Sequence, residues 1–206
     1  HNPWDLAANL KGMTLSIRTG DGGPRPGELA APDPIEIAVH DMSVSLHRRL
    51  GALDIPHLFD DYGPGTHSWP YWQRDLQQEL PRLMKTFGGT PAAADPVTHT
   101  SAEPRFQVHG WQVTIDRART EFATLSGADA YGFTLRGSGI GHVTTPPRYQ
   151  PGSAQTVTVG DGAAWTLRAD AAGRLHLDVP LGTANACQEF RPLCVTRTYA
   201  THVTIE

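Results

Sequence analysis

The sequence is poor in charge and contains no long apolar run. Charged residues make up 18% of its 206 residues, the formal net charge is −4, and lysine and arginine form no cluster. Nucleic-acid-binding domains usually concentrate positive charge on one face, so we expect no nucleic-acid partner. No apolar stretch approaches the roughly 18–20 residues that a membrane-spanning helix needs. We therefore expect no transmembrane segment.

Cysteine is equally scarce, with only Cys187 and Cys194 present. The segment between them contains Pro192 and no histidine, and two cysteines alone are a poor metal site. A local disulfide is the favoured interpretation. Since disulfides persist in oxidising compartments, the pair predicts a secreted protein or one of the cell envelope.

Signals for a metal or cofactor are also missing. The glycine-rich segment 19–24 lacks the spacing of a phosphate-binding loop and leads into no helix. No two histidines have the His-x-His or His-x-x-x-His spacing typical of zinc ligands. We therefore expect neither metal nor cofactor. A zinc enzyme stays the weakest alternative and would use the histidines of the second half, which are His99, His109, His142, His176 and His202.

What the first 87 residues do contain is an alternation of strands and helices. Apolar, β-prone runs predict strands over 13–17 and 55–62. Apolar residues at steps of three and four predict helices over 34–53 and 69–87. Glu36 lies in the first turn of the first helix, where the helix dipole favours a carboxylate. This half is expected to be an α/β domain.

The composition and the hydrophobic pattern of the sequence change after residue 87. Residues 88–104 are rich in proline and alanine and are typical of a linker. Short alternating runs separated by turn signals then predict an antiparallel β-sandwich over 105–206. The expected strands are 106–115, 130–135, 155–159, 163–168, 174–179 and 195–205. The fold class is thus α/β plus all-β.

One histidine lies in an unusual setting. Residues 63–72 read Gly-Pro-Gly-Thr-His-Ser-Trp-Pro-Tyr-Trp, so that His67 occupies a tight turn between a strand and an aromatic-rich helix. Rigid elements on both sides would hold its imidazole at an exposed corner, as a general base requires. An ordinary surface histidine is the alternative.

The order of elements points to one fold. A strand, a helix beginning with a carboxylate, a second strand, a histidine turn and a helix follow one another, as at the end of an α/β-hydrolase, where the catalytic order is Ser, then Asp or Glu, then His. Two strands and two helices alone would leave the faces of a parallel sheet bare. We therefore expect residues 1–87 to be the C-terminal part of such a domain.

The motif Gly-Pro-Gly-Thr-His67-Ser-Trp-Pro-Tyr-Trp-x-x-x-Leu resembles the C-terminal signature of the secreted, antigen-85-like mycolyltransferase-type esterases of actinobacteria. The likeness covers about residues 1–87. It implies a Ser–Glu–His triad in which His67 is the general base and Glu36, 31 positions earlier, is the acid. By the same resemblance Trp69 and Trp72 would line the substrate groove. The alternative acids are Glu28, Asp33 and Asp41.

The nucleophile of that family is missing from the chain. No Gly-x-Ser-x-Gly sequence occurs, and Ser138 lies in Arg-Gly-Ser-Gly within the predicted β domain. The resemblance therefore implies a partner, the N-terminal portion of the same hydrolase, in the same polypeptide or as a separate chain. The substrate would be a lipid or other ester, with water or a sugar hydroxyl as acceptor. This chain alone is expected to be inactive.

A function without catalysis is the second hypothesis. The β-sandwich would bind an envelope glycan or a polymer, or simply pack on the hydrolase as a structural domain. Exposed aromatic rings would form the binding platform, although buried core positions explain the same residues. The candidates are Trp111, Tyr131, Tyr149 and Trp165.

Overall fold

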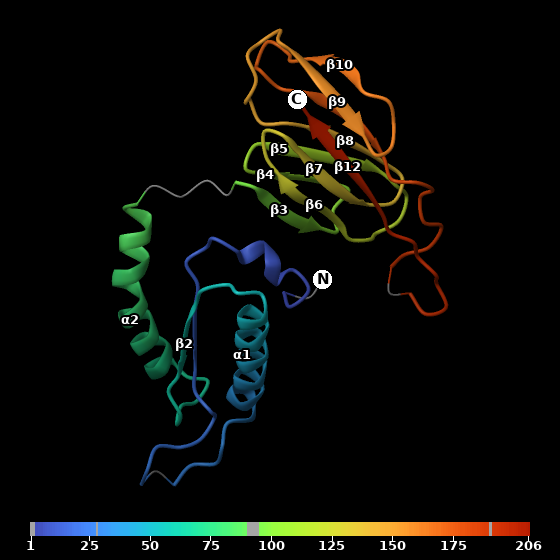
Figure 1. The fold of residues 1–206 in the computed structure, drawn as a ribbon. Coiled ribbons are helices and arrows are strands. Elements are labelled where there is room, and N and C mark those ends of the chain that lie inside the picture. Colours follow the sequence, from blue (N-terminus) through green and yellow to red (C-terminus); the bar gives the residue numbers. More distant parts are fainter. Residues whose placement is uncertain (1–2, 28, 90–94, 190) are drawn as a thin grey trace. The chain divides into compact units, whose positions relative to one another are not determined.

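The computed structural model describes residues 3–27, 29–89, 95–189 and 191–206. The chain divides into two compact units, one ending at residue 92 and the other beginning at residue 93. The first has the α/β content expected of it, and the second consists of antiparallel strands (Figure 1). The predicted mixture of α/β and β structure is confirmed. Each unit is described separately below.

The first unit is built around a short parallel pair of strands. The 3-10 helix η1 (Ala7–Leu10) precedes β1 (Ser16–Thr19), which leads through a long loop to α1 (Pro34–Ala52). The chain returns through β2 (Leu58–Asp61) and ends in α2 (Trp69–Phe87). β1 and β2 are parallel, which requires a crossover, and α1 provides it. All four predicted elements are present. The second strand is shorter than the predicted range 55–62, and the first begins three residues later than the predicted range 13–17 and ends two residues beyond it.

A small core holds this unit together on one side of α1. Leu46, Leu50 and Leu53 of the predicted helical stripe pack there, whereas Met42 is exposed. The buried members are Ala7, Leu50 and Ile55, and Leu10, Leu15, Ile17, Leu46 and Leu53 pack against them. This core fixes α1 against the strand from which the candidate site extends.

Helix α2 turns its polar side toward β1. Ser16 Oγ donates a hydrogen bond to Glu79 Oε1 at 2.8 Å, and Arg18 forms an ion pair with Glu79 at 3.3 Å. Arg82 donates to the backbone oxygen of Leu15 at 3.0 Å. The large apolar side chains of the helix are instead exposed, namely those of Trp69, Trp72, Leu76, Leu80, Met84 and Phe87. The predicted apolar stripe thus exists, but nothing in the described part of the chain buries it.

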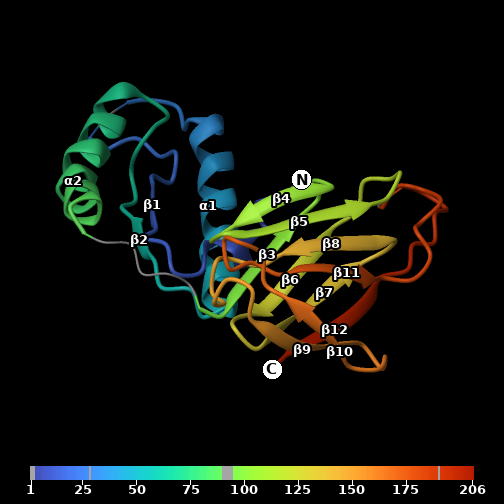
Figure 2. The same cartoon turned by 90° about the horizontal axis from the view of Figure 1, so that it is seen from above.

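The second unit contains two antiparallel sheets, which Figures 1 and 2 show from two directions. One has the order β10-β9-β12-β7-β6-β3 and the other β11-β8-β5-β4. The strands are β3 (Val97–Ser101), β4 (Arg105–Val108), β5 (Trp111–Asp116), β6 (Ala123–Ala128), β7 (Gly132–Gly137), β8 (Ile140–Thr144), β9 (Ala154–Val159), β10 (Trp165–Arg168), β11 (His176–Pro180) and β12 (Tyr199–Ile205).

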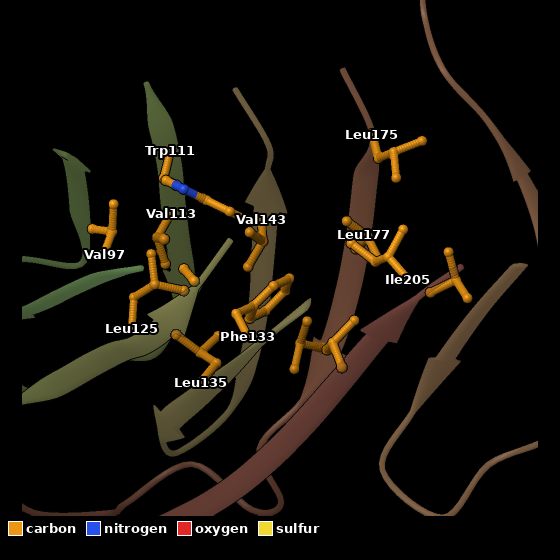
Figure 3. Close-up of a cluster of buried hydrophobic side chains, with 14 of the residues drawn as sticks. Val97, Trp111, Val113, Leu125, Phe133, Leu135, Val143, Leu175, Leu177 and Ile205 are labelled. Carbon is orange, nitrogen blue, oxygen red and sulfur yellow. The ribbon is translucent and has the colours of Figure 1, made fainter. Parts of the chain in front are cut away.

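Alternate residues of both sheets form one apolar core. Trp111, Val113 and Val143 from one sheet meet Leu125, Phe133 and Leu135 from the other (Figure 3). The Trp111 and Phe133 rings lie edge to face with centroids 5.4 Å apart. A core formed by the inner faces of two sheets is the arrangement of a β-sandwich, as the alternating pattern predicts.

The structure corrects several details of this half. The expected strand 106–115 is a hairpin, because His109 and Gly110 both have positive φ and form a turn between β4 and β5. Residues 97–101 of the expected linker form β3, the edge strand of the larger sheet. Strands β6 and β8 have no counterpart in the prediction. Part of the linker, residues 90–94, lies outside the described residues.

Two further expectations concern covalent and membrane structure. Cys187 and Cys194 form the predicted disulfide. Among the described residues, no helix is long and apolar enough to span a membrane.

Candidate active site

The loops that follow β1 and β2 are joined by their backbones. Asp21 N–H donates to the oxygen of Gly63 at 2.8 Å, and Gly22 N–H donates to that of Gly65 at 2.9 Å. A Cβ at Gly20 would lie 2.8 Å from Gly65 Cα, so the two chains approach as closely as glycine alone permits. The glycine-rich segment therefore has a structural role, and it positions the histidine turn beside the start of α1.

Asp33 ties the histidine turn to that helix. As the N-cap of α1, its Oδ1 accepts hydrogen bonds from the N–H groups of Ile35 and Glu36 at 3.0 and 3.3 Å. Its Oδ2 accepts the backbone N–H of His67 at 2.8 Å. This last bond is the main reason that the pKa of Asp33 lies below its ordinary value. Asp33 holds the backbone of His67 and does not contact its imidazole.

Glu36 is the carboxylate that faces the imidazole. Its Oε2 lies 3.0 Å from Nδ1 of His67, and its Oε1 accepts the N–H of Gly20 at 3.1 Å. The Glu36 side chain is 6% exposed and that of His67 is 38% exposed. A buried acid and a solvent-accessible histidine are thus joined through Nδ1. The position of Glu36 in the first helical turn also stabilises its charge.

This contact determines how the imidazole can act. A carboxylate at Nδ1 accepts a hydrogen bond from Nδ1–H, which keeps the proton on that nitrogen and places the lone pair of a neutral ring on Nε2. No described residue hydrogen-bonds to Nε2 of His67, since its contacts are those with Asp33, Glu36 and Trp72. The arrangement can therefore take a proton at Nε2 and stabilise the resulting imidazolium through Glu36.

The two predicted groove residues lie next to the imidazole. The ring of Trp72 meets His67 edge to face with centroids 4.9 Å apart, and Trp69 meets Trp72 in the same way at 6.4 Å. Both tryptophans are exposed. Together they form an apolar surface beside the candidate base.

The alternative acids are placed differently. The Asp41 side chain is largely exposed and approaches His40, with 3.9 Å between Oδ1 and Nδ1. Glu28 lies outside the described residues. Of the described carboxylates, Glu36 alone is hydrogen-bonded to the His67 ring.

Two features of the site were not identified from the sequence. Asp33, expected as an alternative acid, is the N-cap of α1, a role that its position before Pro34 could have indicated. Tyr62 packs behind the turn, where it stacks on Tyr71 and lies beneath the Arg74 guanidinium at 3.5 Å. Burial raises the pKa of Tyr62 to about 12, so this phenol stays neutral and supports the turn.

The structure provides no serine for this base among the described residues. Ser138 is buried in the second unit, where its Oγ donates to Glu121 at 2.7 Å and accepts the N–H of Asn185 at 3.0 Å. Ser68 is close in sequence to His67, but its hydroxyl pairs with that of Thr66 at 2.9 Å. Ser138 therefore has a structural role in the sandwich.

The aromatic candidates of the β-sandwich fall into two groups. Trp111 is fully buried in the core, and Tyr149 is half-buried with its hydroxyl donating to the oxygen of Ala130 at 3.0 Å. Tyr131 and Trp165 are exposed. The interpretation of core packing therefore applies to the first pair, and only the second pair is available to a ligand.

The histidines of the second unit are dispersed over the sandwich. The described residues contain no group of three or more His, Cys, Asp or Glu side chains that could hold a metal ion. His142 instead bridges two strands, with its ring nitrogens 2.6 Å from Asp178 and 3.1 Å from Asp116. These carboxylates raise the pKa of His142, the bond with Asp116 most of all. The remaining four lie on β3, the β4–β5 turn, β11 and β12, in the order His99, His109, His176 and His202.

Comparison with protein-family models, with curated proteins and with solved structures finds no match for this chain. The first unit can therefore be assigned to a class only by its geometry. That geometry is a parallel strand pair with the acid in the helix that follows β1 and the histidine on the loop that follows β2.

Proposed function

We propose that Glu36 and His67 are the acid and the general base of a serine esterase or acyltransferase. The observation that supports this most directly is the 3.0 Å contact between Nδ1 of His67 and the buried Oε2 of Glu36. The acid follows one strand and the histidine follows the next, which is the order of these residues in an α/β-hydrolase. In this proposal the nucleophilic serine and the oxyanion hole belong to the N-terminal portion of the hydrolase.

The chemistry proceeds through an acyl-enzyme. Nε2 of His67 takes the proton of the serine hydroxyl while the serine oxygen attacks the ester carbonyl. Collapse of the tetrahedral intermediate breaks the bond to the alcohol, which leaves with the proton from Nε2. Water or a sugar hydroxyl then attacks the acyl-enzyme with the same base, which releases an acid or a new ester. Glu36 stays ionised and stabilises the imidazolium in both steps.

An additional protein segment would also account for the open surfaces of the first unit. Within the described residues, β1 and β2 pair only with each other, although parallel sheets normally have more strands and covered faces. The apolar side of α2 is exposed from Trp69 to Phe87. A monomeric protein rarely leaves so long an apolar stripe in water. We assign this surface to the N-terminal portion, and we expect the same segment to cover the edge of β1.

The proposed substrate is a lipid or another carboxylic ester. The exposed rings of Trp69 and Trp72 beside His67 would contact its apolar part. The proposed location is outside the cytoplasm, in the secreted fraction or the cell envelope. The disulfide between Cys187 and Cys194 supports this location.

The test is hydrolysis of a p-nitrophenyl ester by the protein that combines this chain with the N-terminal portion. The variant His67→Ala should lower kcat/KM by about 10⁵-fold or more, the scale seen when a catalytic base is removed. His40→Ala is the matched control, because His40 also pairs with a carboxylate, Asp61, at 3.0 Å in the same unit. A chelator should have no effect. Full activity of the His67→Ala variant would contradict the proposal.

A binding function is the second candidate, and the placement of two aromatic residues favours it. The N–H of Ile205 donates to the oxygen of Tyr131, and Ile205 pairs with Val157, which pairs in turn with Trp165. The two exposed residues therefore lie in one row across the strands of the larger sheet. Exposed aromatic rings of this kind can stack on sugars.

Pull-down of the whole chain on insoluble glycan tests this alternative. Tyr131→Ala and Trp165→Ala should each reduce the bound fraction if the rings form the platform. His67→Ala, the control variant, should leave the bound fraction unchanged. Equal retention of all variants would reject it. The whole chain is needed because a fragment beginning at residue 105 would lack β3.

A further inference from the structure

The disulfide closes a loop whose tip has an unusual backbone. Cys194 N–H donates to the oxygen of Arg191 at 3.1 Å, with Pro192 and Leu193 between them. Leu193 has φ of 65°. Proline second and a positive φ third are the features of a type II turn, in which glycine or asparagine normally occupies the third place. A leucine there is unfavourable for the backbone, which suggests that its side chain is needed.

The leucine side chain is not used inside the protein. Leu193 is 104% exposed and Val195 is 86% exposed. Both project from the segment between β11 and β12, the red-orange part of the ribbon in Figure 1. Phe190, which belongs to the same loop, lies outside the described residues. Leu193 thus meets water at the tip of the disulfide-closed loop, and Val195 meets water directly after Cys194.

The base of the loop is fastened to the sandwich, so this exposure is not that of a detached tail. The Glu189 carboxylate accepts the N–H of Phe122 at 2.7 Å, and the Glu189 N–H donates to Thr120 at 3.2 Å. Asn185 hydrogen-bonds to the buried Glu121 and, through Oδ1, accepts the N–H of Arg197 at 2.9 Å. These bonds present the tip at a fixed place on the second unit.

The charge beside the tip is positive. Arg191 and Arg197 flank the two apolar residues, and Arg119 donates to the oxygen of Ala186 at the base of the loop. Within the described part of the chain, no carboxylate forms an ion pair with any of these three arginines. The only carboxylate inside the loop is that of Glu189, which is turned toward the backbone of the sandwich.

From this combination we propose that residues 191–197, which begin with the turn closed by the disulfide, dock on an anionic lipid surface. Leu193 and Val195 enter the boundary between headgroups and acyl chains, and the arginines remain at the level of the phosphates. Apolar insertion and positive charge are the two contributions that together give stable interfacial binding. A soluble polyanion would use the arginines but would have no need of an exposed leucine at positive φ.

Cosedimentation of the whole chain with vesicles tests this proposal. The protein should bind phosphatidylcholine vesicles containing phosphatidylglycerol and bind pure phosphatidylcholine weakly. Leu193→Gly should weaken binding by about tenfold, because part of a leucine side chain no longer enters the lipid. The same variant should not unfold the protein, since glycine accepts the positive φ more readily than leucine. Arg191→Gln should weaken binding by about fivefold, and less at high salt.

Ile140→Ser is the control, since it removes an exposed apolar side chain at the start of β8, elsewhere in the same unit. Its vesicle binding should equal that of the unmodified chain. Failure of the unmodified chain to bind anionic vesicles would overturn the proposal. Binding that Arg191→Gln weakens and Leu193→Gly leaves intact would also overturn it, and would indicate a polyanion site instead.

Discussion

Replacing Glu36 by glutamine changes the chemistry of the candidate site while conserving its shape. The amide oxygen can still accept the N–H of Gly20, which leaves the amide NH₂ facing His67. An NH₂ group donates, so Nδ1 of the ring becomes the acceptor and the proton moves to Nε2. The nitrogen that should act as a base is then protonated. The variant therefore isolates the role of the carboxylate in setting the tautomer.

The expected effects on activity and stability differ greatly in size. The wrong tautomer should lower kcat by about 10⁴-fold in the protein that contains the nucleophile. The free energy of unfolding should fall by only about 1–3 kcal/mol, since a charge-assisted hydrogen bond to a largely buried carboxylate is lost. In this chain alone, nitrogen-15 NMR of His67 should show the proton on Nδ1 in the unmodified protein and on Nε2 in Glu36→Gln.

Glu79→Gln is the matched control for that experiment. Glu79 is also a shielded glutamate of the first unit, and it pairs with Arg18 and Ser16 rather than with a histidine. It should lose a comparable amount of stability and leave the His67 tautomer unchanged. Retention of the Nδ1 proton in Glu36→Gln, or activity equal to that of Glu79→Gln, would refute the assignment of Glu36 as the acid.

Three other predictions concern the support of the site and the β-sandwich. Asp33→Ala removes the N-cap of α1 and the anchor of the histidine turn, and should lower the unfolding free energy by about 1–2 kcal/mol in denaturant titration. Gly20→Ala forces a Cβ to within 2.8 Å of the opposing backbone and should lower the melting temperature and ester hydrolysis together. Asp116 and Asp178 raise the pKa of His142, so the stability that His142 contributes is fully present below the unfolded pKa of about 6.5 and is lost as the pH rises through the higher folded value. Chemical denaturation of His142→Gln should therefore differ most from that of the unmodified chain near pH 6, and a difference that grows in alkali would contradict the prediction.

Local patterns were sufficient to predict the elements of the first unit. The stripes at steps of three and four gave both helices, and the segment 63–72 placed His67 on a turn between β2 and α2. The contact of Glu36 with that histidine agrees with their order in the chain. These features depend on interactions between residues near in sequence, or on a fold order that the sequence itself displays.

The exposure of the apolar side of α2 was not predictable in the same way. The stripe of Leu76, Leu80 and their neighbours indicates an amphipathic helix, but periodicity does not say which side meets the sheet. The polar contacts of Glu79 and Arg82 with β1 decide this, and they join residues more than sixty positions apart. The orientation depends on tertiary contacts that no local pattern encodes.

The strands missed in the β-sandwich have a different cause. β3 reads Val-Thr-His-Thr-Ser, with a single buried apolar residue, and β8 contains a glycine. Such segments carry little apolar alternation, and their pairing with stronger neighbours holds them in the sheets. The cluster of Asp116, His142 and Asp178 was not predicted because it depends on the register of three strands, which the sequence alone does not give.

Fluorophosphonate labelling followed by intact-mass measurement tests the central claim most directly. The protein that combines this chain with the N-terminal portion should take up one label, on a serine in a Gly-x-Ser-x-Gly peptide outside this chain. His67→Ala should abolish the labelling, and His40→Ala should leave its rate unchanged. A serine labelled equally fast in His67→Ala, or no label in the combined protein, would contradict the assignment of His67 and Glu36 as base and acid.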